Sequence, residues 1–420
     1  MPPAAPPESA DHAPPCRFCA APLRHTLVDL GMSPLCQTHI EAQQLDQPEV
    51  FYPLHARVCE KCFLVQLGEV VSPQRIFDDY AYFSSYSDSW VEHAKNFATA
   101  MVERLGLDGG SLVVEVASND GYLLQHFVGA AIPCLGIEPA ANVARVASER
   151  GIETLVRYFG TVTAADVARQ RGQVDLLVGN NVLAHVPDLN DFVAGIALLL
   201  KPDGVVTMEF PHLQRLLEDN QFDTIYHEHF SYFSFFVAEQ VFARHGLTLF
   251  DVEELPTHGG SLRIFGGHAA NRARPVSERV RALREREHAL GLDRLATYAG
   301  FGLRVAAAKR DLLEFLIDAR RAGKRAAGYG APGKGNTLLN YCGIRSDLLD
   351  YTVDRSPYKQ GRFTPGTRIP IYNPDHIRAT RPDYVLILPW NLADEITRQM
   401  AYIAEWGGRF VVPIPRVRVL

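Results

Sequence analysis

The stretch SLVVEVASNDGYLL (residues 111–124) decides the fold of this chain. An apolar run rich in β-branched residues ends at a turn of small and polar residues, Ser118 to Gly121, and a second apolar run follows. This order is typical of a buried strand, a tight turn and the start of a helix. In a doubly wound sheet the ligand binds beyond the carboxyl end of such a strand. The spacing is not G-x-G-x-x-G, so a dinucleotide is not the first expected ligand.

The same alternation of patterns continues on both sides of this stretch. Apolar runs at 132–138, 175–183 and 205–210 alternate with amphipathic stretches. Strands alternating with helices predict an α/β fold with a doubly wound parallel sheet. After a long helical pattern at 301–323, further strand and helix patterns predict a second, smaller Rossmann-like α/β domain.

Four of the seven cysteines form two C-x-x-C pairs, CRFC and CEKC. In an intracellular chain such pairs indicate zinc ligands before disulfides. Two tight turns with two thiolates each complete a tetrahedral site without an open position, so the expected metal is structural. Two unrelated reduced pairs are the alternative. The predicted zinc ligands are Cys16, Cys19, Cys59 and Cys62.

These patterns divide the chain into a disordered Pro-rich tail and three predicted domains. The tail covers 1–15, a zinc-binding domain 16–75, a central domain 76–300 and the carboxy-terminal domain 301–420.

The composition excludes several classes of partner. The 420 residues carry a net charge of −6, from 42 basic and 48 acidic side chains, which favours neither nucleic acid nor an anionic membrane as a partner. No apolar run approaches the ~18 residues that span a bilayer. The amino terminus lacks the pattern of a signal peptide, so we expect a cytoplasmic protein. The oligomeric state stays open.

Two glutamates sharpen the expected ligand of the central domain. Glu115 lies within the first strand, and Glu138 ends the next one. A carboxylate at the end of the second strand is placed to bind the two hydroxyls of a ribose. A helix that starts after the turn would also attract an anionic group to its amides.

A second glycine-rich turn, GYGAPGKGNTLLN (328–340), nearly satisfies two nucleotide motifs. Gly328, Gly330 and Gly333 fit G-x-G-x-x-G, and Asp354 ends the following strand. A P-loop fits as far as Lys334 but then lacks the Ser or Thr that magnesium needs. What remains is a turn suited to a diphosphate. Close packing of helix and strand is the alternative.

The segment IYHEHFSYF (225–233) places a glutamate between two histidines and among aromatic rings. If the segment is extended, Tyr226 and Glu228 face one way and His227 and His229 the other. On a bent loop the side chains could converge. A neutral imidazole is the usual proton acceptor near neutral pH. No third ligand for a metal is evident.

The acidic first strand, the small-residue turn, Glu138 and the segments VGNNVLAHVPDLNDF (178–192) and LKPDGVV (200–206) resemble class I S-adenosylmethionine-dependent methyltransferases. Ala117 stands where that family usually has its first glycine. The resemblance implies S-adenosylmethionine as cosubstrate. The donor-binding residues that it implies are Glu115, Ala117, Asn119, Gly121, Glu138 and Asn180.

With CRFC, CEKC, DDYAYFSSYS (78–87), IYHEHFSYF, THGGSLRIF (257–265) and the second glycine turn in this order, the sequence resembles the three-domain C-methyltransferases that act on nucleotide-linked 4-keto-deoxysugars. The resemblance covers nearly the whole chain from Cys16. It implies that His229 removes a proton next to the ketone, commonly at C3 and in some members of the family at C5, and that the enolate attacks the sulfonium methyl. It also places Tyr226, Glu228, Tyr80 and His185 near the reacting carbons. The substrate diphosphate would lie toward Lys334, Asn336 and Gly330.

Three rival functions remain from the sequence. The same scaffold could methylate oxygen or nitrogen, which demands less of a base. A zinc-containing, nucleotide-like fold could instead be a binding module without catalysis. The second glycine turn could belong to a nicotinamide-dependent dehydrogenase.

Overall fold

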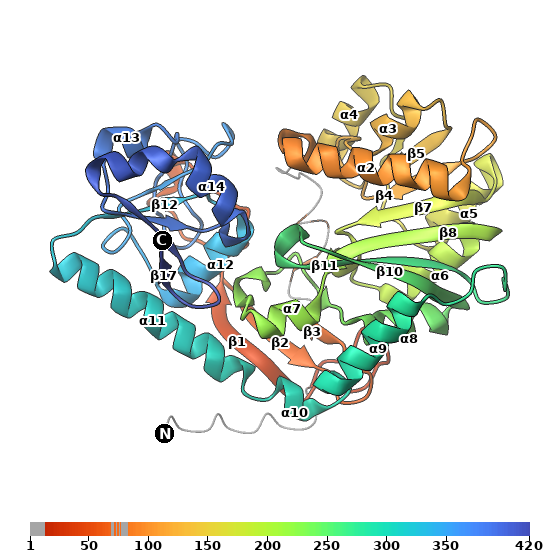
Figure 1. Ribbon diagram of the computed structural model, residues 1–420, viewed down its shortest axis with the longest axis horizontal. Helices are drawn as coiled ribbons and strands as arrows, with labels where there is room; N and C mark the ends of the chain where they lie inside the picture. Colours follow the sequence, from red (N-terminus) through yellow and green to blue (C-terminus); the bar gives the residue numbers. More distant parts are fainter. Residues whose placement is uncertain (1–12, 69–70, 73, 75, 77–82) are drawn as a thin grey trace. The chain divides into compact units, whose positions relative to one another are not determined.

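The computed structural model describes residues 13–68, 71, 72, 74, 76 and 83–420, and Figure 1 shows their elements. Contacts divide the chain into two compact units. Unit 1 comprises residues 1–25, 58–212 and 230–295, and unit 2 comprises 26–57, 213–229 and 296–420. The predicted disordered tail lies almost entirely outside the described residues.

Unit 1 is built on a seven-stranded sheet in the order β10-β11-β8-β7-β4-β5-β6. The strands are β4 (Val113–Val116), β5 (Cys134–Ile137), β6 (Thr154–Leu155), β7 (Val174–Asn180), β8 (Leu200–Pro211), β10 (Leu247–Leu255) and β11 (Ser261–His268). The neighbouring strands β6, β5, β4, β7 and β8 run parallel to one another. The strand β11 runs antiparallel to both of its neighbours, β8 and β10. The strand order reverses between β4 and β7, so the expected ligand edge lies at their carboxyl ends. The predicted doubly wound sheet is confirmed.

Helices cover both faces of this sheet (Figure 1). Val113 of β4 packs in a core with α2 (Asp88–Leu105) and α3 (Leu124–Gly129). Its neighbour Val114 points to the other face. There it packs in a core with α5 (Thr161–Arg171), α6 (Leu189–Leu199) and α8 (Phe235–Arg244). Both faces of β4 are thus buried, which explains why every residue of this strand except Glu115 is apolar.

The remaining elements of unit 1 are short or peripheral. They are α4 (Ala141–Glu149), α9 (Glu278–Leu290) and the antiparallel pair β3 (Val65–Leu67) and β9 (Ser231–Tyr232). Among the described residues, no helix combines the length and apolarity that crossing a bilayer requires.

Unit 2 contains a six-stranded sheet in the order β14-β13-β12-β15-β16-β17. The strands are β12 (Ala326–Tyr329), β13 (Thr352–Val353), β14 (Ile371–Tyr372), β15 (Tyr384–Ile387), β16 (Arg409–Val412) and β17 (Arg418–Val419). All pairs are parallel except β16 with β17. This is the predicted Rossmann-like domain, and its strand order reverses at β12 and β15.

Unit 2 also takes in two segments from earlier in the chain. One carries most of β1 (His25–Ser33) and β2 (Tyr52–Val58), and the other carries α7 (Leu213–Glu218). The helices of the carboxy-terminal part are α11 (Phe301–Arg321), α12 (Gly333–Cys342), α13 (His376–Thr380) and α14 (Ala393–Gln399). The short helix α10 (Leu295–Tyr298) joins the two units in sequence.

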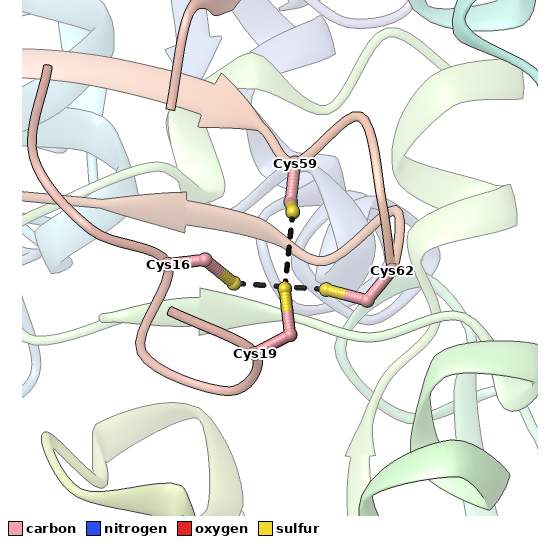
Figure 2. A group of neighbouring side chains, drawn as sticks. All are labelled: Cys16, Cys19, Cys59 and Cys62. Atoms are coloured by element: carbon pink, nitrogen blue, oxygen red, sulfur yellow. Dashed lines mark hydrogen bonds between the residues drawn. The ribbon is translucent and has the colours of Figure 1, made fainter. Parts of the chain in front are cut away.

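The four cysteines of the two C-x-x-C pairs converge in unit 1 (Figure 2). The sulfur of Cys16 lies 3.6 Å from that of Cys62, and the sulfur of Cys19 lies 3.5 Å from that of Cys59. All four sulfurs lie within 4.8 Å of one another. A tetrahedral zinc with Zn–S bonds of about 2.3 Å needs sulfurs about 3.8 Å apart, so the donor set fits zinc. Four thiolates leave no open position, which makes the site structural.

We expect purified protein to contain stoichiometric zinc and Cys59→Ser to lose both the metal and part of its thermal stability, since the metal's binding energy contributes to folding. Metal analysis and thermal melting measure both effects. Cys134→Ser is the matched control, because Cys134 lies in β5 outside the cluster. Zinc-free wild-type protein, or equal stability of Cys59→Ser and the control, would contradict the assignment.

Candidate active site

The turn after β4 runs through the left-handed region of backbone conformation. Ala117, Asn119 and Gly121 have φ values of 56°, 50° and 78°. A non-glycine residue held there costs on the order of 1 kcal/mol, and such strain gathers at ligand-binding turns. Glycine is favoured at 121, because a Cβ there would lie 2.3 Å from Ile152 Cδ1 and the backbone has a positive φ.

The carboxylate of Glu138 organises this turn from the carboxyl end of β5. Its Oε2 accepts a hydrogen bond from the backbone N–H of Asn119 and its Oε1 one from Ala140, both at 2.9 Å. Burial raises the pKa of Glu138, although the two backbone donors oppose the shift. The side chain therefore shapes the edge at which the sequence predicts ribose binding.

Two more predicted donor-binding residues lie buried at this edge or just below it. Glu115 lies inside β4, and burial together with the charge of Glu138 raises its pKa well above the usual range, while a hydrogen bond from Tyr122 opposes this. Asn180 ends β7 with 8% of its surface exposed. Within the described part of the chain, neither polar atom of its amide has a hydrogen-bond partner. An orphaned amide at the ligand edge fits a polar group of the methyl donor.

Residues beyond the prediction gather at the same edge. Asn181, at a φ of 55°, follows β7, and its Nδ2 lies 3.3 Å from Nε2 of His258, itself at a φ of 55°. His258 lies in the turn between β10 and β11, whose ends pair beside the carboxyl end of β8. Both residues lie within the sequence motifs described above, but the motifs do not indicate a role for them. Their left-handed backbone gives no signal in the sequence.

The structure gives less information about two other predicted catalytic residues, His185 and Tyr80. His185 ends a short 3-10 helix, Leu183–His185, after β7 and is half-buried. The role near the reacting carbons that the resemblance implies for His185 stays a prediction. Tyr80 lies outside the described residues.

In unit 2 the segment from Tyr226 to His229 forms a tight bend. The backbone N–H of His229 donates to the carbonyl of Tyr226 at 2.9 Å, and the two rings pack with centroids 4.1 Å apart. Both side chains are half-buried, whereas His227 and Glu228 are buried. The extended alternative, with alternating faces, is therefore wrong, and the bent loop is correct.

The two histidines of this bend have different surroundings. Nε2 of His227 lies 3.2 Å from the carbonyl of Pro53, its ring packs edge-on against Tyr52, and burial lowers its pKa. Nδ1 of His229 lies 3.0 Å from the carbonyl of Thr224. Since a carbonyl only accepts, Nδ1 carries the proton in the neutral ring and Nε2 carries the lone pair. Each histidine thus has one ring nitrogen near a backbone carbonyl, but His227 is buried whereas His229 is half-buried. The role of His229 as a base stays a prediction.

Glu228 contacts a third segment, at Cys36, whereas the two histidines contact Pro53 and Thr224. Its Oε1 accepts a hydrogen bond from the thiol of Cys36 at 3.5 Å, and both side chains are buried. Burial and the charge of Glu228 raise the pKa of Cys36 well above its usual range, so the thiol keeps its proton. Sequence reasoning missed Cys36, because no spacing motif links it to a residue 192 positions away.

The second glycine turn already has partners within unit 2. A Cβ on Gly330, at a φ of 87°, would lie 2.6 Å from Pro389. Lys334 Nζ donates to Asn391 Oδ1 at 2.8 Å and lies 4.6 Å from the centre of the Trp390 ring. Burial lowers the pKa of Lys334, although the charge of buried Asp223 opposes this. The predicted role of Gly330 and Lys334 toward a diphosphate stays a prediction.

The third residue predicted for the diphosphate, Asn336, is 1% exposed. Its Nδ2 donates to the carbonyl of Cys36 at 2.6 Å. The carboxylate of Asp354, which would bind the ribose in a dinucleotide site, accepts from the N–H groups of Ala331 and Ser356, both at 2.8 Å. Lys359 lies 3.3 Å away from it. These contacts speak against the dehydrogenase alternative.

Comparison with known proteins places the chain among methyltransferases. Family models match as a zinc binding domain at 16–77, a methyltransferase domain at 90–252 and a C-methyltransferase C-terminal domain at 256–415. The C-methyltransferase NovU of Streptomyces niveus is 38% identical over 407 residues, which are 96% of each chain.

More distant similarities cover only part of the chain. A ubiquinone biosynthesis O-methyltransferase of Bordetella avium is 32% identical over 99 residues, covering 23% of this chain and 41% of that protein. A solved S-adenosylmethionine-dependent methyltransferase of Clostridium acetobutylicum aligns with 43% of this chain and 92% of its own, at 10% identity and a TM-score of 0.35.

The sheet order of unit 1, its strained turn and the four-cysteine cluster agree with the order of the matched domains. The cosubstrate of this chemistry is S-adenosylmethionine, and the metal of the cysteine cluster is zinc. Because the relative at 38% identity matches nearly the full length of both proteins, the chain belongs to the family of S-adenosylmethionine-dependent C-methyltransferases.

Proposed function

We propose that the protein transfers the methyl group of S-adenosylmethionine to C3 of a nucleotide-linked 4-keto-deoxysugar, as a step in making a branched sugar. The observation that carries this proposal is the orientation of His229. The hydrogen bond from Nδ1 to Thr224 fixes the tautomer that has a basic Nε2. An amine acceptor can attack a sulfonium methyl unaided, so a built base favours a carbon acceptor, whose proton must first be removed.

The chemistry follows from that base. Nε2 of His229 accepts the proton from C3, which the neighbouring ketone acidifies, and the electron pair of the broken C–H bond enters the enolate. The enolate carbon bonds to the methyl carbon, the sulfur–methyl bond breaks, and S-adenosylhomocysteine leaves. Tyr226 or Tyr80 donates a hydrogen bond to the developing oxyanion at C4, where preorganised donors contribute about 10²–10³ in rate.

The remaining groups bind and orient the two substrates. We assign the methyl donor to Glu138, Asn119 and Asn180 of unit 1, and His185 to the sugar. The diphosphate is assigned to the second glycine turn, beside Lys334. The NovU relative is named only as a C-methyltransferase, so the sugar nucleotide rests on the sequence resemblance and on the base.

Replacing His229 by Asn is expected to lower kcat by about 10²–10³, because the amide can still donate to Thr224 but cannot take a proton. Steady-state kinetics with a panel of nucleotide-linked 4-keto sugars measures the loss, and calorimetry should find the affinity for S-adenosylmethionine within twofold of wild type. His288→Asn is the control, since His288 is exposed on α9. Near-normal turnover of His229→Asn would refute the base.

A sugar deuterated at C3 separates carbon methylation from oxygen or nitrogen methylation. The proposed reaction removes the hydrogen from C3, so the methylated product should lack the label. Mass spectrometry of the product reads this directly. A methylated product that keeps its deuterium would refute methylation at C3. The position of the new methyl group in that product would then separate methylation at C5 from the alternative, an O- or N-methyltransferase on the same scaffold.

Glu138→Gln should weaken S-adenosylmethionine binding by about tenfold, equivalent to about 1.4 kcal/mol, because the amide keeps only one of the two acceptor oxygens. Calorimetric titration measures the affinity. Glu149→Gln provides the matched control, since Glu149 is an exposed carboxylate at the end of α4. Equal affinity in the two variants would remove Glu138 from the donor site.

A further inference from the structure

We propose that the second glycine turn and helix α12 position the catalytic bend of unit 2, with Asn336 and Cys36 as positioning residues for methyl transfer. This inference deepens the proposed function and rests on it, since it takes the bend around His229 as the seat of the base. It gives Asn336 a role other than binding the diphosphate.

The first link joins Cys36 to the bend. Its thiol donates to Oε1 of Glu228, and the two side chains are 3% and 4% exposed. A buried carboxylate keeps its charge and orientation only where donors satisfy it. The hydrogen bond therefore fixes the rotamer of Glu228 and the backbone on which the neighbouring His229 sits.

The second link joins Cys36 to α12. Asn336 lies in the first turn of that helix, and its Nδ2 donates to the Cys36 carbonyl at 2.6 Å. A Cβ on Gly333 would lie 2.9 Å from the Cys36 sulfur. Glycine at 333 is thus what allows the helix to approach the thiol, independently of any ligand.

A second arm reaches the other end of the bend. Oγ1 of Thr337 donates to the carbonyl of Ile225 at 3.3 Å. Nε1 of Trp390, which follows β15, donates to Oδ2 of Asp223 at 2.7 Å. Asp223 and Thr224 belong to one short 3-10 helix, and Thr224 supplies the carbonyl that fixes the tautomer of His229.

Together these contacts lie at the edge where a Rossmann-like sheet ordinarily takes its nucleotide. Their hydrogen bonds engage Asn336 and Thr337 but not Lys334, to which the diphosphate is assigned. That edge lies at the carboxyl ends of β12 and β15, where the strand order reverses. Glycines there permit close approach of a backbone or a phosphate alike. In this chain the approaching groups are the carbonyls and side chains of two distant segments, 34–40 and 223–229.

The test compares Cys36→Ala, Cys36→Ser and Asn336→Leu with Cys342→Ala. Cys342 is buried on α12, the helix that also carries Asn336, and Cys342→Ala is the control for the loss of a buried thiol. Positioning predicts that Cys36→Ala and Asn336→Leu lower kcat about tenfold with KM for the sugar nucleotide within twofold, since misplacing a base costs rate rather than binding. Cys36→Ser should recover most of kcat, because its hydroxyl also donates.

A diphosphate-binding Asn336 would instead raise KM and leave kcat unchanged. That result, or wild-type kinetics in Cys36→Ala, would overturn the inference. Equal losses of kcat in Cys36→Ala and Cys342→Ala would also overturn it, because any cavity left by a buried thiol would then have the same effect.

Nitrogen-15 magnetic resonance of the histidine rings keeps the test independent of turnover. The signal of His229 is assigned by its loss in His229→Asn. The ring should be protonated on Nδ1 in wild type and Cys342→Ala, and should become a mixture of tautomers in Asn336→Leu. If wild type methylates no sugar in the panel, the proposed function fails, and an unchanged tautomer in Asn336→Leu would then separately overturn the positioning role.

Discussion

Parallel strands impose the constraint on which both units depend. In a parallel sheet all strands end at the same edge, so the turns that follow them lie along that edge. A crevice opens there at the point where the order of strands reverses. In unit 1 this gathers the turn after β4, the end of β5 and the end of β7. In unit 2 the same rule places the turn after β12 beside the turn after β15. The same feature gathers the predicted donor-binding residues in unit 1 and, in our proposal, positions the bend of His229 in unit 2.

Much of this arrangement could be predicted from the order of residues. Apolar runs of strand length with small-residue turns between them predicted both sheets, because strands buried on both faces consist mostly of apolar side chains. The two C-x-x-C pairs predicted the cysteine cluster, since their spacing dictates local geometry. Glu138 could be placed because its position depends only on where a strand ends.

The rest depended on contacts between distant segments, which no periodicity records. The bend at Tyr226 to His229 is set by a backbone hydrogen bond and by partners such as Pro53 and Cys36, which lie 174 and 192 positions away in the sequence. Cys36 had no motif around it, and yet it holds Glu228. The glycine turn was ambiguous for a physical reason, because a missing Cβ permits close approach without saying what approaches. Ala117, which stands where the resembled family usually has glycine, adopts a left-handed backbone, and no sequence pattern indicates this.

Unit 2 is assembled from three separate stretches of the chain, which affects the order in which its contacts can form during synthesis. The hydrogen bond between Asn336 and Cys36 spans 300 positions of sequence. A ribosome releases the amino-terminal stretch long before the carboxy-terminal one. β1 and β2 are neighbours in one sheet and can pair early, whereas the contacts of Cys36 and of Ile225 with α12 join distant positions and form late. A chain that ends before α12 would keep the hydrogen bond from His229 to Thr224 but would lack the support that we propose for it.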